Sequence, residues 1–168
     1  MTHTFSTQVR RAVALTVATA ALPMLGGRPA NAHVHATPER VKPGANATVV
    51  FGIGHGCGTS ATTSVAIKVP ATVTNVVAVA PKGWTASISK SVVTFSGGKL
   101  ADKTKGSFGV RFVAPATTGV LLFPTVQTCL TGKNSWTQAP LTNGKEPENP
   151  APFVIVTNTS ATAKATSP

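Results

Sequence analysis

The segment TTSVAIKV, residues 62–69, alternates between two kinds of side chain along its length. Successive side chains of an extended strand point to opposite faces, so Thr63, Val65, Ile67 and Val69 share one face. The opposite face carries small or polar side chains, and the proline that follows ends the run. The segment therefore predicts a β-strand with one buried face.

Working outward from this strand, further short apolar segments occur on both sides, separated by glycine and proline residues. Gly97-Gly98 is one expected turn. No stretch shows the longer period of an amphipathic helix. The pattern predicts an all-β fold, a β-sandwich of immunoglobulin-like or cupredoxin-related type. The other expected strands lie at residues 47–53, 73–79, 84–88, 92–95, 107–113, 119–128 and 152–156.

The N-terminal segment has the order of a secretory signal peptide. Arg10 and Arg11 form a basic start, residues 12–25 are mostly apolar, and Ala30-Asn31-Ala32 is a small-x-small cleavage motif. We therefore expect residues 1–32 to be removed by cleavage after Ala32. The product would be secreted or periplasmic.

Residues 33–156 would then form one β-sandwich domain. Residues 141–150 are polar and proline-rich, which is typical of a surface loop, and residues 157–168 predict a disordered polar tail. No later apolar run reaches the roughly 18 residues that cross a bilayer, so we expect no membrane span in the mature chain.

The composition argues against several classes of protein. The formal net charge is +11, but the Lys and Arg residues are scattered, and the chain has no Tyr and only two Trp. Nucleic-acid binding requires clustered basic residues and stacking aromatics, so we expect no nucleic-acid partner. Four Asp and Glu are too few for paired acid–base catalysis, and neither a Gly-x-Ser-x-Gly elbow nor a phosphate loop occurs. We expect a binding protein and not an enzyme.

Both cysteines, Cys57 and Cys129, fall in the expected exported part. In an oxidising compartment such a pair predicts one disulfide, which would stabilise the fold by about 4 kcal/mol in the loop-entropy model. The alternative is a metal site made by His55 and the Cys57 thiolate, a ligand pair that suits copper(I).

His33 would be the first residue of the processed chain. Its freed α-amine and its ring nitrogen Nδ1 could then chelate one metal ion, an arrangement called a histidine brace, with a third ligand from elsewhere. A second arrangement is a tripeptide chelate, in which the amine, two deprotonated amides and the His35 ring bind copper(II) or nickel(II). A third is that no metal binds. Because residues 33–38 alternate like a strand with paired amides, we expect the brace, with copper(II) as the ion.

His55 is a further candidate metal ligand, since it lies in a glycine-rich turn between Gly54 and Gly56. A histidine in an exposed turn is usually only solvated, but this one could also supply a third donor at His33. Nothing near it in the sequence decides between the two roles.

Several short motifs occur in order along the chain. They are Ala32-His33-Val34, His55-Gly56-Cys57, Thr62-Thr63-Ser64-Val65, Gly83-Trp84, the FPTVQTC segment of residues 123–129, Trp136 and Pro150-Ala151-Pro152. In this ordered set the chain resembles the YcnI-like copper-binding proteins of bacterial envelopes. The resemblance covers nearly all of residues 33–156.

The resemblance implies an immunoglobulin-like, cupredoxin-related sandwich that holds copper(II) through the amine and ring of His33, with Trp136 packed beside the metal. It also implies a disulfide between Cys57 and Cys129. The implied role is copper acquisition, delivery or homeostasis. The implied partners are the copper ion and a membrane copper importer or another copper carrier.

One position departs from that family. Related chains often carry a Glu two residues after the tryptophan, where this chain has Gln138. An amide oxygen is a poorer copper(II) ligand than a carboxylate. The site here would then be completed by His55, His35, water or another group.

Two other functions remain open. A copper monooxygenase acting on polysaccharide would use the same brace with His55 as a second ring, although few aromatic side chains are free to line a substrate face. A metal-free adhesion or structural module would use the same fold without a metal at His33.

Overall fold

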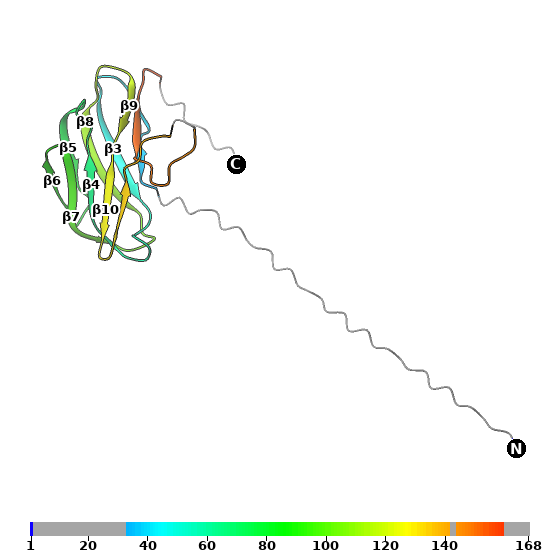
Figure 1. Ribbon diagram of the computed structural model, residues 1–168. Coiled ribbons are helices and arrows are strands. Elements are labelled where there is room, and N and C mark those ends of the chain that lie inside the picture. Colours follow the sequence, from blue (N-terminus) through cyan, green and yellow to red (C-terminus); the bar gives the residue numbers. More distant parts are fainter. Residues whose placement is uncertain (2–32, 142–143, 160–168) are drawn as a thin grey trace. The chain divides into compact units, whose positions relative to one another are not determined.

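The computed structural model describes residues 33–141 and 144–159 together with Met1 (Figure 1). The expected signal peptide and its cleavage site after Ala32 lie outside the described residues. So does the part of the expected tail from residue 160 onward.

The described residues form strands joined by turns and contain no helix, so the all-β prediction is confirmed. None of the described segments is therefore a helix long and apolar enough to span a membrane. The strands build three sheets with the orders β1-β3-β8-β5, β11-β10-β4-β7-β6 and β2-β12-β9. Their bounds are β1 His35–Thr37, β2 Arg40–Val41, β3 Asn46–Ile53, β4 Thr62–Lys68, β5 Thr74–Val79, β6 Thr85–Ser89, β7 Val92–Leu100, β8 Gly106–Val113, β9 Gly119–Leu122, β10 Thr125–Cys129, β11 Lys133–Trp136 and β12 Phe153–Val156.

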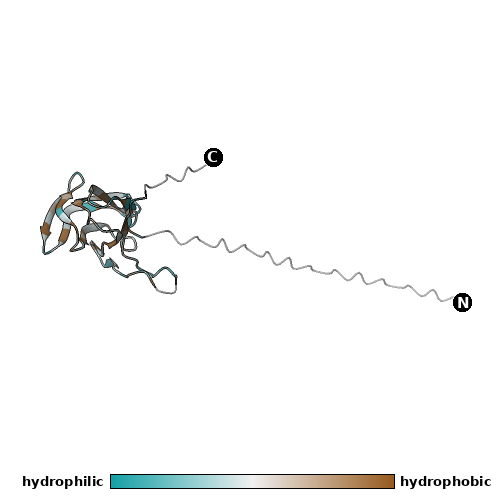
Figure 2. Ribbon diagram, turned by 90° about the horizontal axis from the view of Figure 1, so that it is seen from above, coloured by the Kyte–Doolittle hydropathy of each residue, from teal (hydrophilic) through white to brown (hydrophobic). Residues whose placement is uncertain are grey.

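The core lies where strands of different sheets meet. Val65 and Ile67 of β4 are fully buried, as their alternation predicts, and Phe108 of β8 is also fully buried. The Phe108 ring lies 5.3 Å from the ring of Phe95 in β7, a strand of another sheet. Figure 2 shows apolar stretches in brown interspersed with paler ones along the strands, as expected when one face of each strand is buried.

The run 119–128, expected as one strand, is two strands in different sheets, so this prediction was wrong. The break falls at Phe123-Pro124, where proline has no N–H to donate to a ladder. The Phe123 N–H donates to the Pro152 carbonyl at 2.8 Å, and the Phe123 ring packs among those of Phe51 and Phe112. The chain therefore changes sheets at a residue that is fully buried.

The expected turn at Gly97-Gly98 was also wrong, because both glycines lie inside β7. The Trp84 ring occupies the space that a side chain at Gly98 would need. The glycine therefore serves close packing and not chain reversal.

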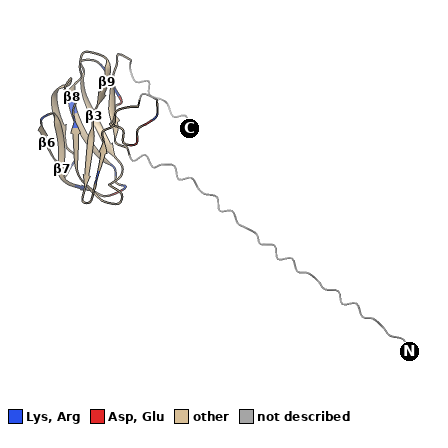
Figure 3. Cartoon of the chain, viewed as in Figure 1, with Lys and Arg blue, Asp and Glu red and all other residues tan. Residues whose placement is uncertain are grey.

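Charged side chains are sparse over the sandwich, and most of its ribbon is uncharged (Figure 3). The strands β1 and β11 stand at the ends of two of the sheet orders. These two end strands, with the loop before β12, position the candidate site.

Candidate metal centre

His33 lies two residues before the start of β1, and the residue between them, Val34, is anchored in the core. Val34 is 4% exposed and belongs to the hydrophobic core cluster. His35 then begins β1 and pairs with Gly52 of β3. Burial of a valine side chain stabilises by roughly 1.5–3 kcal/mol, so the backbone next to His33 is held against the sheet.

Trp136 contacts the His33 ring from a different sheet. The two ring centroids are 5.5 Å apart with planes at 65°, an edge-on contact. Trp136 is the last residue of β11, is 4% exposed and pairs with Thr125 of β10. Ring pairs of this kind contribute about 0.5–1.5 kcal/mol beyond their buried area. The contact orients the imidazole and excludes water from one side of it.

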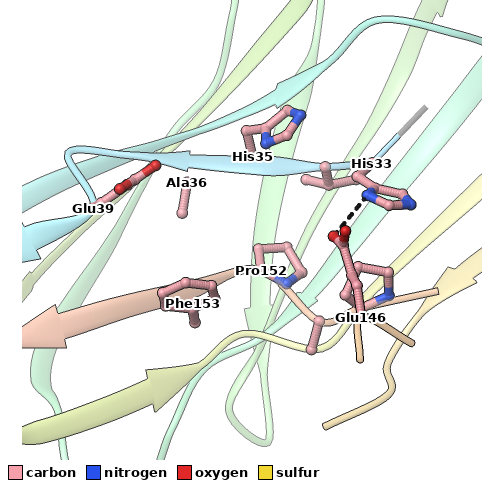
Figure 4. A pocket seen from close by; sticks show the side chains of 10 residues that line it. His33, His35, Ala36, Glu39, Glu146, Pro152 and Phe153 are labelled. Atoms are coloured by element: carbon pink, nitrogen blue, oxygen red, sulfur yellow. Dashed lines mark ion pairs between the residues drawn. The ribbon is translucent and has the colours of Figure 1, made fainter. Parts of the chain in front are cut away.

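Glu146 meets the His33 ring at its Nδ1 atom. The Oε1 atom of Glu146 lies 3.2 Å from this nitrogen, in a pocket of about 100 Å³ (Figure 4). The Glu146 side chain is 68% exposed and the His33 side chain 22%, so this ion pair alone contributes only about 0–1 kcal/mol. Its importance is geometric, because it brings a carboxylate to a ring nitrogen.

Sequence reasoning missed Glu146, since it treated residues 141–150 only as a surface loop. A usable signal was present. The whole chain has four Asp and Glu residues, and Glu146 and Glu148 both fall in this loop. Such a concentration of a scarce residue type is reason to ask what the loop faces.

Gln138 closes the loop that carries Glu146. Its side-chain oxygen Oε1 accepts a hydrogen bond from the Asn149 backbone N–H at 2.6 Å. Its own N–H donates to the Asn149 carbonyl at 3.0 Å, and its carbonyl accepts from the Ala151 N–H at 2.8 Å. The amide side chain is therefore committed to holding the two ends of the loop together.

The structure separates the side chains of His33 and His35. His35 is exposed, and Figure 4 shows its ring on the opposite side of β1 from Glu146. Of the two histidines, only His33 has its ring at Glu146, although both residues line the same two hollows.

His55 lies in the turn between Gly54 and Gly56, half-buried. The residue lines a hollow of about 420 Å³ that His33 and His35 also line. Across residues 33–141 and 144–159, no three His, Cys, Asp or Glu side chains form a group that could hold a metal ion.

The side chain of Gln127 connects the turn at His55 with Trp136, and the residue is buried, with 1% of its surface exposed. Its Nε2 donates to the His55 carbonyl at 2.6 Å and to the Thr62 hydroxyl at 2.7 Å. Its Oε1 accepts from Trp136 Nε1 and from Asn134 Nδ2, both at 3.4 Å. Sequence reasoning gave Gln127 no role. The signal was a long polar residue at an inward-facing position of a strand, which must find partners when buried.

Cys57 and Cys129 form a disulfide, with Cα atoms 6.0 Å apart across a sequence separation of 72 residues. The predicted disulfide is confirmed. Because both thiols are consumed, the alternative metal site that used the Cys57 thiolate beside His55 was wrong.

Asp102 fixes the turn that carries His55. Its Oδ1 accepts a hydrogen bond from the Gly56 N–H at 2.9 Å. This hydrogen bond is the largest cause that lowers the pKa of Asp102 below its ordinary value, and Lys103 and His55 add to it through their charges. Asp102 is therefore held in its ionised form next to the turn.

A family model described as a domain of unknown function, DUF1775, matches residues 33–93 and 90–156. The chain belongs to the DUF1775 family. The match begins at His33 and ends at the last residue of β12. A comparison of this DUF1775 protein with curated proteins gives no match.

Solved structures resemble this DUF1775 domain in fold. An uncharacterized protein from Nocardia farcinica with an immunoglobulin-like fold is 26% identical, with a TM-score of 0.65 over 74% of this chain and 97% of that chain. The predicted immunoglobulin-like β-sandwich is confirmed. The Reelin-N domain of F-spondin is 11% identical, with a TM-score of 0.48 over 75% of this chain and 86% of that one. A type I cohesin–dockerin complex from Clostridium thermocellum is 11% identical, with a TM-score of 0.47 over 74% of this chain and 98% of that chain.

Proposed function

We propose that the protein, once residues 1–32 are removed, binds copper(II) at His33 and takes part in copper acquisition or delivery outside the cytoplasm. One observation carries this proposal. The Nδ1 atom of His33, the residue at which the family match begins, lies 3.2 Å from the Glu146 carboxylate. The His33 ring also contacts the buried ring of Trp136.

The donor set suits the ion. A free α-amine and the Nδ1 atom of His33 would supply two nitrogen donors, and Glu146 would supply an oxygen donor. Copper(II) favours nitrogen and oxygen donors in a tetragonal arrangement and heads the divalent affinity order. The Nδ1 atom and the Glu146 carboxylate already face each other at 3.2 Å.

The identity of residue 138 supports Glu146 as the oxygen ligand. In the YcnI-like copper-binding proteins that this chain resembles, a Glu often occupies this position. Here Gln138 uses its side-chain oxygen to hold Asn149. The carboxylate would instead come from Glu146, on the loop that Gln138 closes.

The backbone after His33 favours the brace over the tripeptide chelate. In that chelate the amides of Val34 and His35 must both turn toward the metal and lose their protons. Val34 is buried in the core, and His35 is paired with Gly52 of β3. Turning them would give up that burial and that pairing.

The small number of donors supports a carrier role. Two nitrogens and one carboxylate leave coordination positions open, and a partner can use them to take the metal. A membrane copper importer or another copper carrier would be the recipient. Trp136 would exclude water from one side of the site.

The test is a copper(II) titration of residues 33–168 beside the same chain with the His33 α-amine acetylated. Acetylation removes the amine as a ligand and leaves every side chain in place. We expect it to weaken binding by about 100-fold or more, which corresponds to about 2.7 kcal/mol. Equal affinities would exclude the brace. A His35→Ala variant that lost most of the affinity would support the tripeptide chelate instead.

The same proteins test the two other functions. Copper-dependent release of oxidised oligosaccharides from chitin or cellulose would establish a monooxygenase. A His33→Ala variant with unchanged copper affinity would favour a metal-free module.

A further inference from the structure

His33 borders two hollows of opposite charge. The first is the pocket where Glu146 meets Nδ1, and Glu39 also lines it. The second, of about 420 Å³, lies among residues of β1, β3 and β8 and the loops next to them. We call it the basic hollow. The ionisable residues that line it are His33, His35, His55, Lys103 and Lys105.

Three glycines contribute to the lining of the basic hollow. Gly52 stands opposite His35 in the pairing of β1 with β3, and Gly54 and Gly106 also line the hollow. A Cβ atom on Gly54 would meet no heavy atom within 4 Å. Gly54 therefore accepts a side chain without a clash, whereas a Cβ atom on Gly106 would meet the side chains of Leu100 and Phe108.

The lining of the basic hollow is rich in basic residues, although Asp102 interacts through its charge with Lys103 and His55, and Glu146 faces His33. None of the described residues that line it is Asp or Glu. The neighbouring Asp102 directs its carboxylate to the Gly56 N–H at 2.9 Å. Lys103 and Lys105 are exposed. Ammonium and imidazole N–H groups are the side-chain donors that form charge-assisted hydrogen bonds with anions.

We propose that the basic hollow binds the carboxylate groups of a small organic copper chelator, so that copper(II) reaches His33 as an anionic complex. This inference rests on the proposed function. The volume falls within the roughly 300–1,000 Å³ range of small-molecule sites. Because His33 itself lines the hollow, a chelator held by Lys103 and Lys105 can keep another carboxylate on a metal at His33.

The transfer is a ligand exchange in which copper stays copper(II). Bonds from copper to carboxylate oxygens break as bonds to the α-amine nitrogen and Nδ1 of His33 form. The α-ammonium group releases its proton to water. The lysines receive the carboxylates that leave the metal, and this lowers the cost of displacing them.

The experiment uses isotopically labelled citrate as the probe, in equilibrium dialysis against residues 33–168. Citrate is presented alone and as its copper(II) complex. We expect the copper-loaded protein to retain about one citrate per chain. Copper(II) titration without citrate runs in parallel, so that failure of the metal site is seen separately from failure of the hollow.

Two variants and a matched control test the location. Asn tolerates the positive φ of 59° at Lys103, so the first variant is Lys103→Asn with Lys105→Gln. Loss of two charge-assisted contacts should lower citrate retention about tenfold while copper affinity without citrate changes less than about twofold. Gly54→Val should do the same by filling the space. Lys68→Gln with Lys82→Gln removes equal charge away from the hollow and should leave retention unchanged.

Several outcomes would overturn the proposal. One is a copper-loaded wild-type protein that leaves all citrate free, and another is equal retention in the hollow variant and the matched control. Displacement of labelled citrate by inorganic phosphate as readily as by unlabelled citrate would mean a general anion site. If a glutamate-rich peptide displaces labelled citrate at lower concentrations than unlabelled citrate does, the hollow binds an acidic protein segment instead.

Discussion

Trp136 and Glu146 approach the same histidine ring but are held in different ways. Trp136 ends a strand, is buried and donates toward Gln127, which also fixes the turn at His55. Glu146 sits on an exposed loop that Gln138 closes at its base. One neighbour of His33 is therefore fixed by the core, whereas the other is free to adjust.

This difference suits a carrier. A metal that must be released benefits from one donor that can withdraw at little cost, while the fixed side preserves the orientation of the ring. Changes on the Trp136 side should therefore affect stability, and changes on the Glu146 side should affect metal affinity. Four predictions test this division, in order of expected size.

The largest effect should come from Gly56→Ala, in the turn that Asp102 and Gln127 hold. A Cβ atom there would overlap the Ser60 carbonyl oxygen, which is backbone and cannot move aside. We expect the free energy of unfolding in urea to fall by about 3 kcal/mol. Gly54→Ala is the control, because its Cβ meets nothing within 4 Å. Equal losses in the two variants would show that the turn is not fixed in the way described.

Gln127→Leu should follow. It leaves the His55 carbonyl, the Thr62 hydroxyl and the Trp136 N–H without their partner, at a cost of about 2 kcal/mol in unfolding free energy. The electron paramagnetic resonance spectrum of bound copper(II) should also change, because Trp136 is no longer oriented. Gln138→Leu, on the exposed loop, is the control and should cost under about 1 kcal/mol. A larger loss of unfolding free energy in Gln138→Leu than in Gln127→Leu would contradict the view that the Trp136 side is the fixed one.

Glu146→Gln should weaken copper(II) binding about tenfold, which corresponds to about 1.4 kcal/mol. The unfolding free energy of the metal-free variant should stay within about 0.5 kcal/mol of the wild-type value. The charge and the best oxygen donor are lost, but the ion pair is exposed. Glu148→Gln, two residues away, is the matched control for isothermal titration. If both variants lose affinity equally, the effect is one of general charge.

The smallest effect concerns pH. The pKa of Asp102 is lowered in the folded state, chiefly by the Gly56 N–H. Its contribution to stability is therefore complete above the ordinary carboxyl pKa and is lost as the pH falls through the lowered value. Asp102→Asn should remove this part of the acid dependence in urea melts taken at a series of pH values. If the unfolding free energy of the variant falls with decreasing pH as steeply as that of the wild type, other groups cause the acid sensitivity.

The strands were predictable where burial of one face dictates alternation, as in β4 and β8. The run 119–128 failed because hydrophobicity alone does not show that a chain leaves one sheet for another at Pro124. The scarcity of carboxylates marked the loop of Glu146 as unusual, but its pairing with His33, far away along the chain, depends on the folded loop. Gln127 was readable in principle, since a glutamine among inward-facing residues must find partners.

The edge-on contact between Trp136 and His33 gives the protein a built-in optical reporter. A paramagnetic ion held by that ring would quench indole fluorescence at short range. Trp84, which packs against Phe108, emits from different surroundings and supplies a second signal within the same chain. Replacing each tryptophan by phenylalanine in turn would assign the two signals, so that loading and release of the ion can be followed in real time without any attached dye.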